Sequence, residues 1–326
     1  IGVAYSFQGN YQLAENNYLE ASDILLSAFG SVHPLYAQNL CRLGMVNYKK
    51  KDFLKAEGYF FLAMEILKKV ISESHSTYVE LQNDMAYLLI KTQRNFKAYE
   101  LMNDVFQKKY KQIADNFEWL TDNQKEAYWK KESSFYEGLS VFANEVFQKV
   151  PEAVGLNFNA SLLAKSKLLE VKILSNDQLS QEDKIDPENQ ELREELGFRR
   201  RLLAKLESEG SLEKSRLDKL KFEVDSLDKR LTLSWPEYAQ QKKNLLITWD
   251  QVQQSLEEGE AAIEFERFKN KSDSLIYYNA LVLKKGDSQP RLIQLCSERD
   301  LQAINPEKGY NAYYGLVWQP MENALE

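Results

Sequence analysis

Small and apolar residues recur every 42 positions between residues 2 and 105. Polar turns, at residues 9–11 and 51–53, separate a shorter apolar segment from a longer one in each unit. This period predicts stacked pairs of helices, because one pair is too small to bury its apolar face alone. Four sets of equivalent positions carry the pattern: Gly2/Gly44/Ala86, Ala14/Ala56/Ala98, Tyr18/Phe60/Met102 and Ala21/Ala63/Val105.

The links between units repeat as well. The segment from Ser31 to Tyr36 recurs from Glu73 to Tyr78, and this places His33 and His75 at equivalent positions. Equivalent placement predicts a structural role for both histidines, as packing or capping residues, rather than a catalytic one.

The pattern resembles the tetratricopeptide repeat in its 42-residue form, with a His-Pro link like that of kinesin-light-chain-type arrays. The small residue at the eighth position of that family is matched by Gly2, Gly44 and Ala86, and the alanine at the twentieth by Ala14, Ala56 and Ala98. The resemblance covers about residues 1–110. Because Gly2 matches the eighth position, we expect the sequence to begin inside a repeat and further repeats to precede it.

Helical periodicity continues from 111 to 176, although the 42-residue register is lost. Thr121–Gln124 reads as a capping box, and Pro151 suits the first turn of the next helix. We interpret 111–176 as degenerate helical repeats that close the array.

Residues 177–244 are predicted to form a polar linker, at 177–187, and an antiparallel helical hairpin. Two runs of leucine-rich positions are spaced three and four residues apart, with Gly210 and Ser211 between them as the turn and Pro236 as the stop. The first run is Leu192, Leu196, Arg199, Leu203 and Leu206, and the second is Leu217, Leu220, Val224, Leu227 and Leu231.

The pattern changes to α/β from 245 to 326. A capping box at Thr248–Gln251 opens a short helix, and a last helical stretch is predicted around Tyr313–Leu325. The middle strand is apolar on both faces, so we expect it to pack against the hairpin or against further chain, and we expect residues 245–326 alone to be insoluble. The predicted strands are Ala262–Phe268, Leu275–Leu283 and Arg291–Cys296.

This last region resembles the opening of a CHAT domain, a caspase-like peptidase module. The resemblance lies in Ile247–Val252, Gly259–Phe265, Tyr278–Leu283 and Leu316–Glu322. It implies a parent protein with a cysteine and histidine dyad, and in the family both residues follow later elements of the sheet. We therefore expect no catalytic residue in this chain, and whether the parent is an active enzyme stays open. The fold class is thus mainly α: a tetratricopeptide-type solenoid, then the antiparallel hairpin, then a partial α/β caspase-like region.

Composition narrows the function further. The net charge is −7 and basic residues alternate with acidic ones, which argues against nucleic-acid binding. No apolar run is long enough to cross a bilayer. Two cysteines, Cys41 and Cys296, suit a reducing compartment, so we expect a cytoplasmic location and a role for both as small apolar filler. No metal-ligand spacing or phosphate loop is present, so no metal or cofactor is expected, and the oligomeric state stays open.

The resemblance to tetratricopeptide repeats implies a groove lined by the first helix of each repeat, with a protein or peptide as its ligand. Asn83 is the best single candidate, because an amide can donate to and accept from a peptide backbone. The alternative is that this surface is only the polar face of a solenoid. The predicted groove residues are Gln38, Cys41, Met45, Lys49, Glu80, Asn83, Tyr87 and Lys91.

Three functions remain open. In the first, the repeats are the partner-binding region of a CHAT-domain peptidase, and binding in the groove alters how the hairpin docks against the sheet. In the second, the chain is a non-catalytic scaffold with a degenerate CHAT-like docking domain. The third is a co-chaperone that clamps a carboxylate, for which Lys49 and Lys91 are the only basic groove residues.

Overall fold

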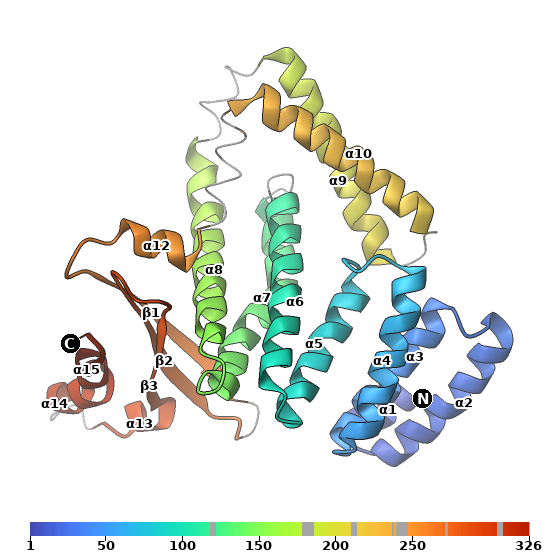
Figure 1. Cartoon of the computed structure of the whole chain (residues 1–326), viewed down its shortest axis with the longest axis horizontal. Coiled ribbons are helices and arrows are strands. Elements are labelled where there is room, and N and C mark those ends of the chain that lie inside the picture. The colour runs from blue at the N-terminus through green and yellow to red at the C-terminus, as the bar shows by residue number, and fades with distance from the viewer. Residues whose placement is uncertain are drawn as a thin grey trace. The chain divides into compact units, whose positions relative to one another are not determined.

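The computed structural model describes residues 1–117, 122–177, 186–209, 214–236, 238, 247–270, 273–304 and 309–325. The chain divides into two compact units. Figure 1 shows the helices and strands of the chain. Unit 1 combines Ile1–Trp119 with Pro187–Trp235, and unit 2 combines Leu120–Asp186 with Pro236–Glu326. Within the described residues, no helix is both long and apolar enough to span a membrane.

Unit 1 opens with three pairs of helices, and the predicted 42-residue helical pairs are confirmed. Each helix packs against the next one along the chain. The second helix of every pair buries the alanine and the large apolar residue that the repeat pattern places inside. The helices are α1 (Gly2–Phe7), α2 (Tyr11–Phe29), α3 (Pro34–Lys49), α4 (Phe53–Val70), α5 (Ser76–Lys91) and α6 (Asn95–Phe117).

The small residue of each first helix lies directly against a large side chain of the second. A Cβ added at Gly44 would lie 2.4 Å from the ring of Phe60, and one added at Gly2 would lie 2.8 Å from the ring of Tyr18. Both distances are shorter than any real carbon contact, so an aromatic residue at this site requires glycine opposite it. In the third pair the equivalent residues are Ala86 and Met102, both buried.

The turn inside each pair is also repeated. Gly9, Lys51 and Gln93 all adopt the left-handed conformation, with φ of 76°, 64° and 62°. The next residue then donates its backbone N–H to a carbonyl five residues back, as in the Schellman ending of a helix. The three equivalent bonds are Asn10 to Tyr5, Asp52 to Asn47 and Arg94 to Leu89, each 2.9 Å from nitrogen to oxygen.

The two histidines cap helices. The Nδ1 atom of His33 accepts the backbone N–H of Leu35, and Nδ1 of His75 accepts the N–H of Thr77, both at 3.2 Å. Each interaction satisfies a donor that the first turn of a helix leaves without a partner in the helix. The predicted structural role of His33 and His75 is confirmed.

Unit 1 also contains α9 (Pro187–Glu209) and α10 (Lys214–Ser234), which form the predicted hairpin. Asn189 bonds Ser234 while Arg199 pairs with Glu223, so the two helices run antiparallel. Helix α10 ends before Pro236, as expected. The proposed turn at Gly210 and Ser211 lies outside the described residues. Buried heptad residues are Leu192, Leu196, Leu217, Val224, Leu227 and Leu231.

Unit 2 holds an antiparallel sheet in the order β1-β2-β3, and the three predicted strands are confirmed. The strands are β1 (Ala261–Lys269), β2 (Ile276–Lys284) and β3 (Arg291–Ser297). Phe265 of β1 pairs with Ala280, which pairs on its other side with Ile293. The helices of the unit are α7 (Asp122–Val146), α8 (Glu152–Asp177), α12 (Trp249–Ser255), α13 (Glu298–Gln302), α14 (Gly309–Tyr313), the π-helix η4 (Tyr314–Trp318) and α15 (Gln319–Leu325).

The middle strand is buried on both faces, as its sequence indicates, but its cover differs from the expectation. Leu281 and Leu283 pack against α8, whereas Ala280 and Val282 pack with Met321 of α15. The described cover of both faces comes from helices of unit 2 itself. The expectation was wrong because an apolar strand specifies how much surface must be buried but not which helix buries it.

Helices α7 and α8 pack as a pair and group with the sheet. Pro151 lies directly before α8, while the capping box expected at Thr121 lies outside the described residues. That α7 and α8 are degenerate repeats stays a prediction. The capping box at Thr248 and Gln251 is confirmed at the start of α12.

A buried carboxylate links β1 to α7 and α8. Glu266 is 9% exposed, and its Oε2 accepts Nδ2 of Asn157 at 2.7 Å. Ser140 donates to the amide oxygen of Asn157 at 3.3 Å. Burial raises the pKa of Glu266 to about 7, against the lowering effect of Asn157, Ser140 and Lys165.

Gly44→Ala is expected to destabilise the protein by about 1–3 kcal/mol, because the new methyl group overpacks against Phe60. The matched control is Gly58→Ala in α4, where an added Cβ meets nothing within 4 Å and should stabilise by about 0.5–1 kcal/mol. Adding Phe60→Met to Gly44→Ala copies the third repeat and should recover much of the loss. Urea unfolding measures all three variants, and equal stability of the two single variants would contradict this packing.

Glu266→Gln is expected to change how stability depends on pH. The folded-state pKa of about 7 lies above the ordinary 4.5, so the native protein binds a proton that the unfolded chain has released. Native stability should therefore fall as pH rises from 4.5 to 7, by up to about 3 kcal/mol, and then level off. In Glu266→Gln this fall should be absent. Urea unfolding at pH 4.5, 6, 7 and 8 tests it, and a constant difference between the two proteins would refute the assignment.

Candidate protein-binding site

The predicted groove residues lie on one face of two neighbouring first helices. On α3 and on α5 they are spaced three, four and four residues apart, which keeps them on one side of each helix. α3 and α5 contact each other, and because only α4 separates them in the chain both run in the same direction. The α3–α5 face consists of Gln38, Cys41, Met45, Lys49, Glu80, Asn83, Tyr87 and Lys91.

Exposure divides the α3–α5 face into a centre and an edge. The four central residues are half-buried, and the four at the helix ends are exposed. The central side chains are uncharged at neutral pH, whereas three of the four edge residues carry a charge. The central residues are Cys41, Met45, Asn83 and Tyr87, and the edge residues are Gln38, Lys49, Glu80 and Lys91.

Charge is distributed unevenly along the α3–α5 face. Lys49 and Lys91 are the last residues of α3 and α5, where a cation also suits the helix dipole. Glu80 lies near the start of α5, and Asp84 follows one turn later. The C-terminal end of the face is therefore basic, and Glu80 gives the N-terminal end a negative charge.

Cys41 is unsuited to nucleophilic chemistry. Burial, together with the carboxylates of Asp84 and Glu80, raises the pKa of its thiol to about 12. The thiol is protonated at neutral pH, so Cys41 contributes packing and a weak donor only. Asp84 was missed from the sequence, because its position is one residue away from the expected helical stripe.

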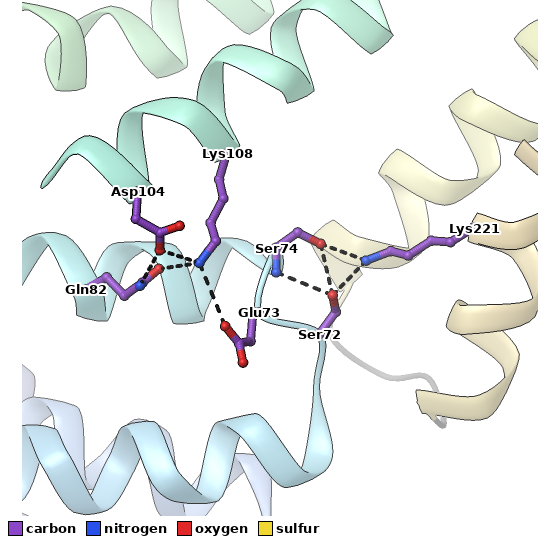
Figure 2. A network of polar contacts seen from close by, with 7 residues as sticks. All are labelled: Ser72, Glu73, Ser74, Gln82, Asp104, Lys108 and Lys221. Carbon is purple, nitrogen blue, oxygen red and sulfur yellow. Dashed lines mark hydrogen bonds and ion pairs between the residues drawn. The ribbon is translucent and has the colours of Figure 1, made fainter. Parts of the chain in front are cut away.

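The start of α5 is held by the hairpin, as Figure 2 shows. Lys221 of α10 donates to the hydroxyls of Ser72 and Ser74, both at 2.7 Å, in the link between α4 and α5. The two hydroxyls are 2.9 Å apart. One ammonium group thus fixes the link that leads into the α3–α5 face.

A second set of polar contacts in Figure 2 ties α5 to α6. Lys108 donates to Asp104 at 2.6 Å and to the amide oxygen of Gln82 at 3.0 Å. Gln82 in turn donates to Asp104 at 2.7 Å, which closes a ring of three side chains. Gln82 directly precedes Asn83, so this ring fixes the part of α5 that carries the centre of the face.

A buried arginine joins the hairpin to α6. Arg200 of α9 is 3% exposed, with Nη2 2.7 Å from Asp228 of α10 and 3.8 Å from Asp115 of α6. The sequence indicated a hairpin but not where it docks. Within unit 1 the hairpin contacts α6 and the link between α4 and α5. Docking of the hairpin against the sheet stays a prediction.

Catalytic and metal chemistry find little support among the described residues. No group of three or more histidine, cysteine, aspartate or glutamate side chains there could hold a metal ion. Cys296 is buried at the end of β3, and burial together with Asp300 raises the pKa of its thiol. Both histidines of the chain are already used as helix caps.

Comparisons with known proteins give one family match, in the N-terminal part. The family model described as tetratricopeptide repeat matches residues 1–69. A crystal structure of TPR-like repeats ascribed to a kinesin light chain of Podosopora anserina is similar at 15% identity and a TM-score of 0.39. The alignment covers 71% of this chain and 92% of that one. None of the curated proteins compared matches the chain. By the family model, residues 1–69 of this protein consist of tetratricopeptide repeats.

Proposed function

We propose that this protein is an interaction scaffold whose α3–α5 face binds an extended segment of a partner protein. The observation that carries the proposal is the half-buried centre of the face, which lies on two adjacent helices and has exposed charges at both ends. Arrays of this type present extended surfaces built from equivalent positions of successive repeats.

The side chains of the α3–α5 face suit a peptide backbone with acidic side chains. The amide of Asn83 can donate to one peptide carbonyl and accept one peptide N–H. Met45 and Tyr87 supply apolar contact beside it. Lys49 and Lys91 occur once per repeat, so they pair best with two acidic side chains of an extended ligand.

This arrangement distinguishes a peptide-binding face from a clamp for a single carboxylate. A clamp requires several donors that converge on one anion. Here the two lysines belong to different helices, and Glu80 lies on the same face with Asp84 beside it. A segment that carries charge along its length fits this distribution better than one terminal carboxylate does.

The test begins with selection of random peptides on the whole chain, followed by affinity measurements for those that bind. Acidic peptides should be enriched. Asn83→Ala should lower the affinity for these peptides about tenfold, because a buried hydrogen bond to the peptide is lost. Lys49→Glu with Lys91→Glu should abolish the preference for acidic residues. The matched control is Phe61→Ala on α4, which removes an exposed side chain away from the α3–α5 face. Equal effects of Asn83→Ala and Phe61→Ala would refute the proposal.

We further propose that the sheet of unit 2 is the first part of a CHAT-like, caspase-related domain. Supporting it, the segments that carry the resemblance fall on α12, β1, β2 and the helix pair η4–α15, in the expected order. In that case the repeats recruit the partner of a cysteine peptidase whose dyad belongs to later elements. The rival is a scaffold in which this region serves for docking only.

Neither version gives Cys296 a catalytic role. Burial and Asp300 raise the pKa of its thiol, so little thiolate is present at neutral pH. We expect slow alkylation of Cys296 by iodoacetamide in the native protein and no hydrolysis of peptide substrates by this chain. Peptide cleavage that Cys296→Ala abolishes would overturn that expectation.

A further inference from the structure

A shallow pocket on unit 2 is lined by aromatic rings and one carboxylate. All of its residues come from the continuous helical segment α14–η4–α15. Their large exposed fractions make them unusual, because tyrosine and tryptophan commonly bury most of their ring. Tyr310 is 82% exposed and Trp318 is 51% exposed. The lining residues are Tyr310, Tyr313, Tyr314, Trp318 and Glu322.

The π-helix explains how these side chains gather on one side. The backbone N–H of Gln319 donates to the carbonyl of Tyr314, five residues back, which widens the turn. In an α-helix of 3.6 residues per turn, side chains four apart drift steadily around the axis. The wider turn offsets part of that drift. It keeps Tyr310, Tyr314, Trp318 and Glu322 on one stripe.

The opposite side of the same segment fixes the pocket to the sheet. Val317, Met321 and Leu325 pack with the apolar residues of β2 and β3. Trp318 makes an edge-on contact with Phe265 of β1, with ring centroids 6.4 Å apart and planes at 77°. The pocket is therefore held by a packed core, and its aromatic surface is arranged before any ligand arrives.

The chemistry of the lining indicates a cation. Aromatic faces attract positive charge, and Glu322 adds a full negative charge at the edge. Tyr310 and Tyr314 are nearly parallel, at 25° with centroids 6.5 Å apart, and Tyr314 donates its hydroxyl to Glu322. Parallel rings favour a planar cation. A carboxylate acceptor favours one that can donate hydrogen bonds, which a quaternary ammonium group cannot do.

From these features we infer that the pocket of Tyr310, Tyr314, Trp318 and Glu322 binds an arginine side chain of a partner protein. The guanidinium stacks on the tyrosine and tryptophan rings and donates hydrogen bonds to Glu322. The site belongs to unit 2, so it is independent of the peptide-binding role proposed for the α3–α5 face.

The test uses the whole chain and two matched probes, N-acetyl-arginine methylamide and its neutral isostere N-acetyl-citrulline methylamide. Binding is followed by NMR at the indole N–H of Trp318, which is assigned with Trp318→Phe. We expect saturable binding of the arginine probe. The citrulline probe should bind about tenfold more weakly, because it makes neither the cation–π contact nor the ion pair. Equal binding of the two probes would overturn the inference, as would tighter binding of tetramethylammonium.

Variants locate the site without risk to the fold. Tyr310→Ala removes a side chain that is mostly exposed. It should lower the affinity for the arginine probe about fivefold, as expected for the loss of one cation–π contact. Glu322→Gln should reduce the preference for arginine over citrulline. Phe222→Ala on α10, an equally exposed aromatic residue in unit 1, is the control and should leave binding unchanged. An unchanged arginine affinity in Tyr310→Ala would exclude this pocket.

Discussion

The structure of unit 1 depends on the close approach of a first helix to the aromatic ring of the second. At Gly44 and Gly2 the space that a methyl group would need is already occupied by Phe60 and Tyr18. This contact sets the distance between the helices of a pair, and stacking of pairs then creates the α3–α5 face. In the third repeat the equivalent residues are Ala86 and Met102. The flexible side chain of methionine can adjust to the methyl group of alanine, whereas a rigid ring cannot. A glycine in the first helix of a pair therefore indicates an aromatic ring opposite it in the second helix. The small residues thus help to predict the helix pairs as much as the apolar residues do.

That constraint is local in the sequence, which explains why the repeats could be predicted. Glycine and aromatic residues sixteen positions apart, the histidine caps and the left-handed turns each depend on a few neighbouring residues, and all of them recur with the same period. The strands and the α12 capping box were predictable for the same reason. The packing of elements far apart in the sequence could not be predicted. The burial of β2 by α8 and α15, and the docking of α10 on the Ser72–Ser74 link, bring together residues far apart in sequence whose side chains carry no periodic signal.

The candidate sites show the same division. Helical spacing placed eight residues on one face of α3 and α5, but it did not reveal the half-buried centre, nor Asp84 beside Cys41. The aromatic pocket of unit 2 was missed because four-residue spacing of aromatic side chains is also what a buried helix face shows. Only the structure shows that Tyr310 and Trp318 are largely exposed. Glu266 looked like one more polar position of an alternating strand, and only the structure shows that it is buried against Asn157.

Two contacts of different chemistry hold the hairpin to the array. Lys221 donates to two hydroxyl groups, and a hydrogen bond of this kind contributes on the order of 1 kcal/mol. Arg200 is different, because it is buried beside Asp228 and Asp115, and removing one partner of a buried pair costs several times more. The Arg200 contact to α6 thus contributes more to holding the hairpin than the Lys221 contact to the link that precedes α5. Since α5 carries half of the α3–α5 face, a ligand with modestly different affinity for two positions of that link would change the population of the Lys221 contact and leave the Arg200 contact in place.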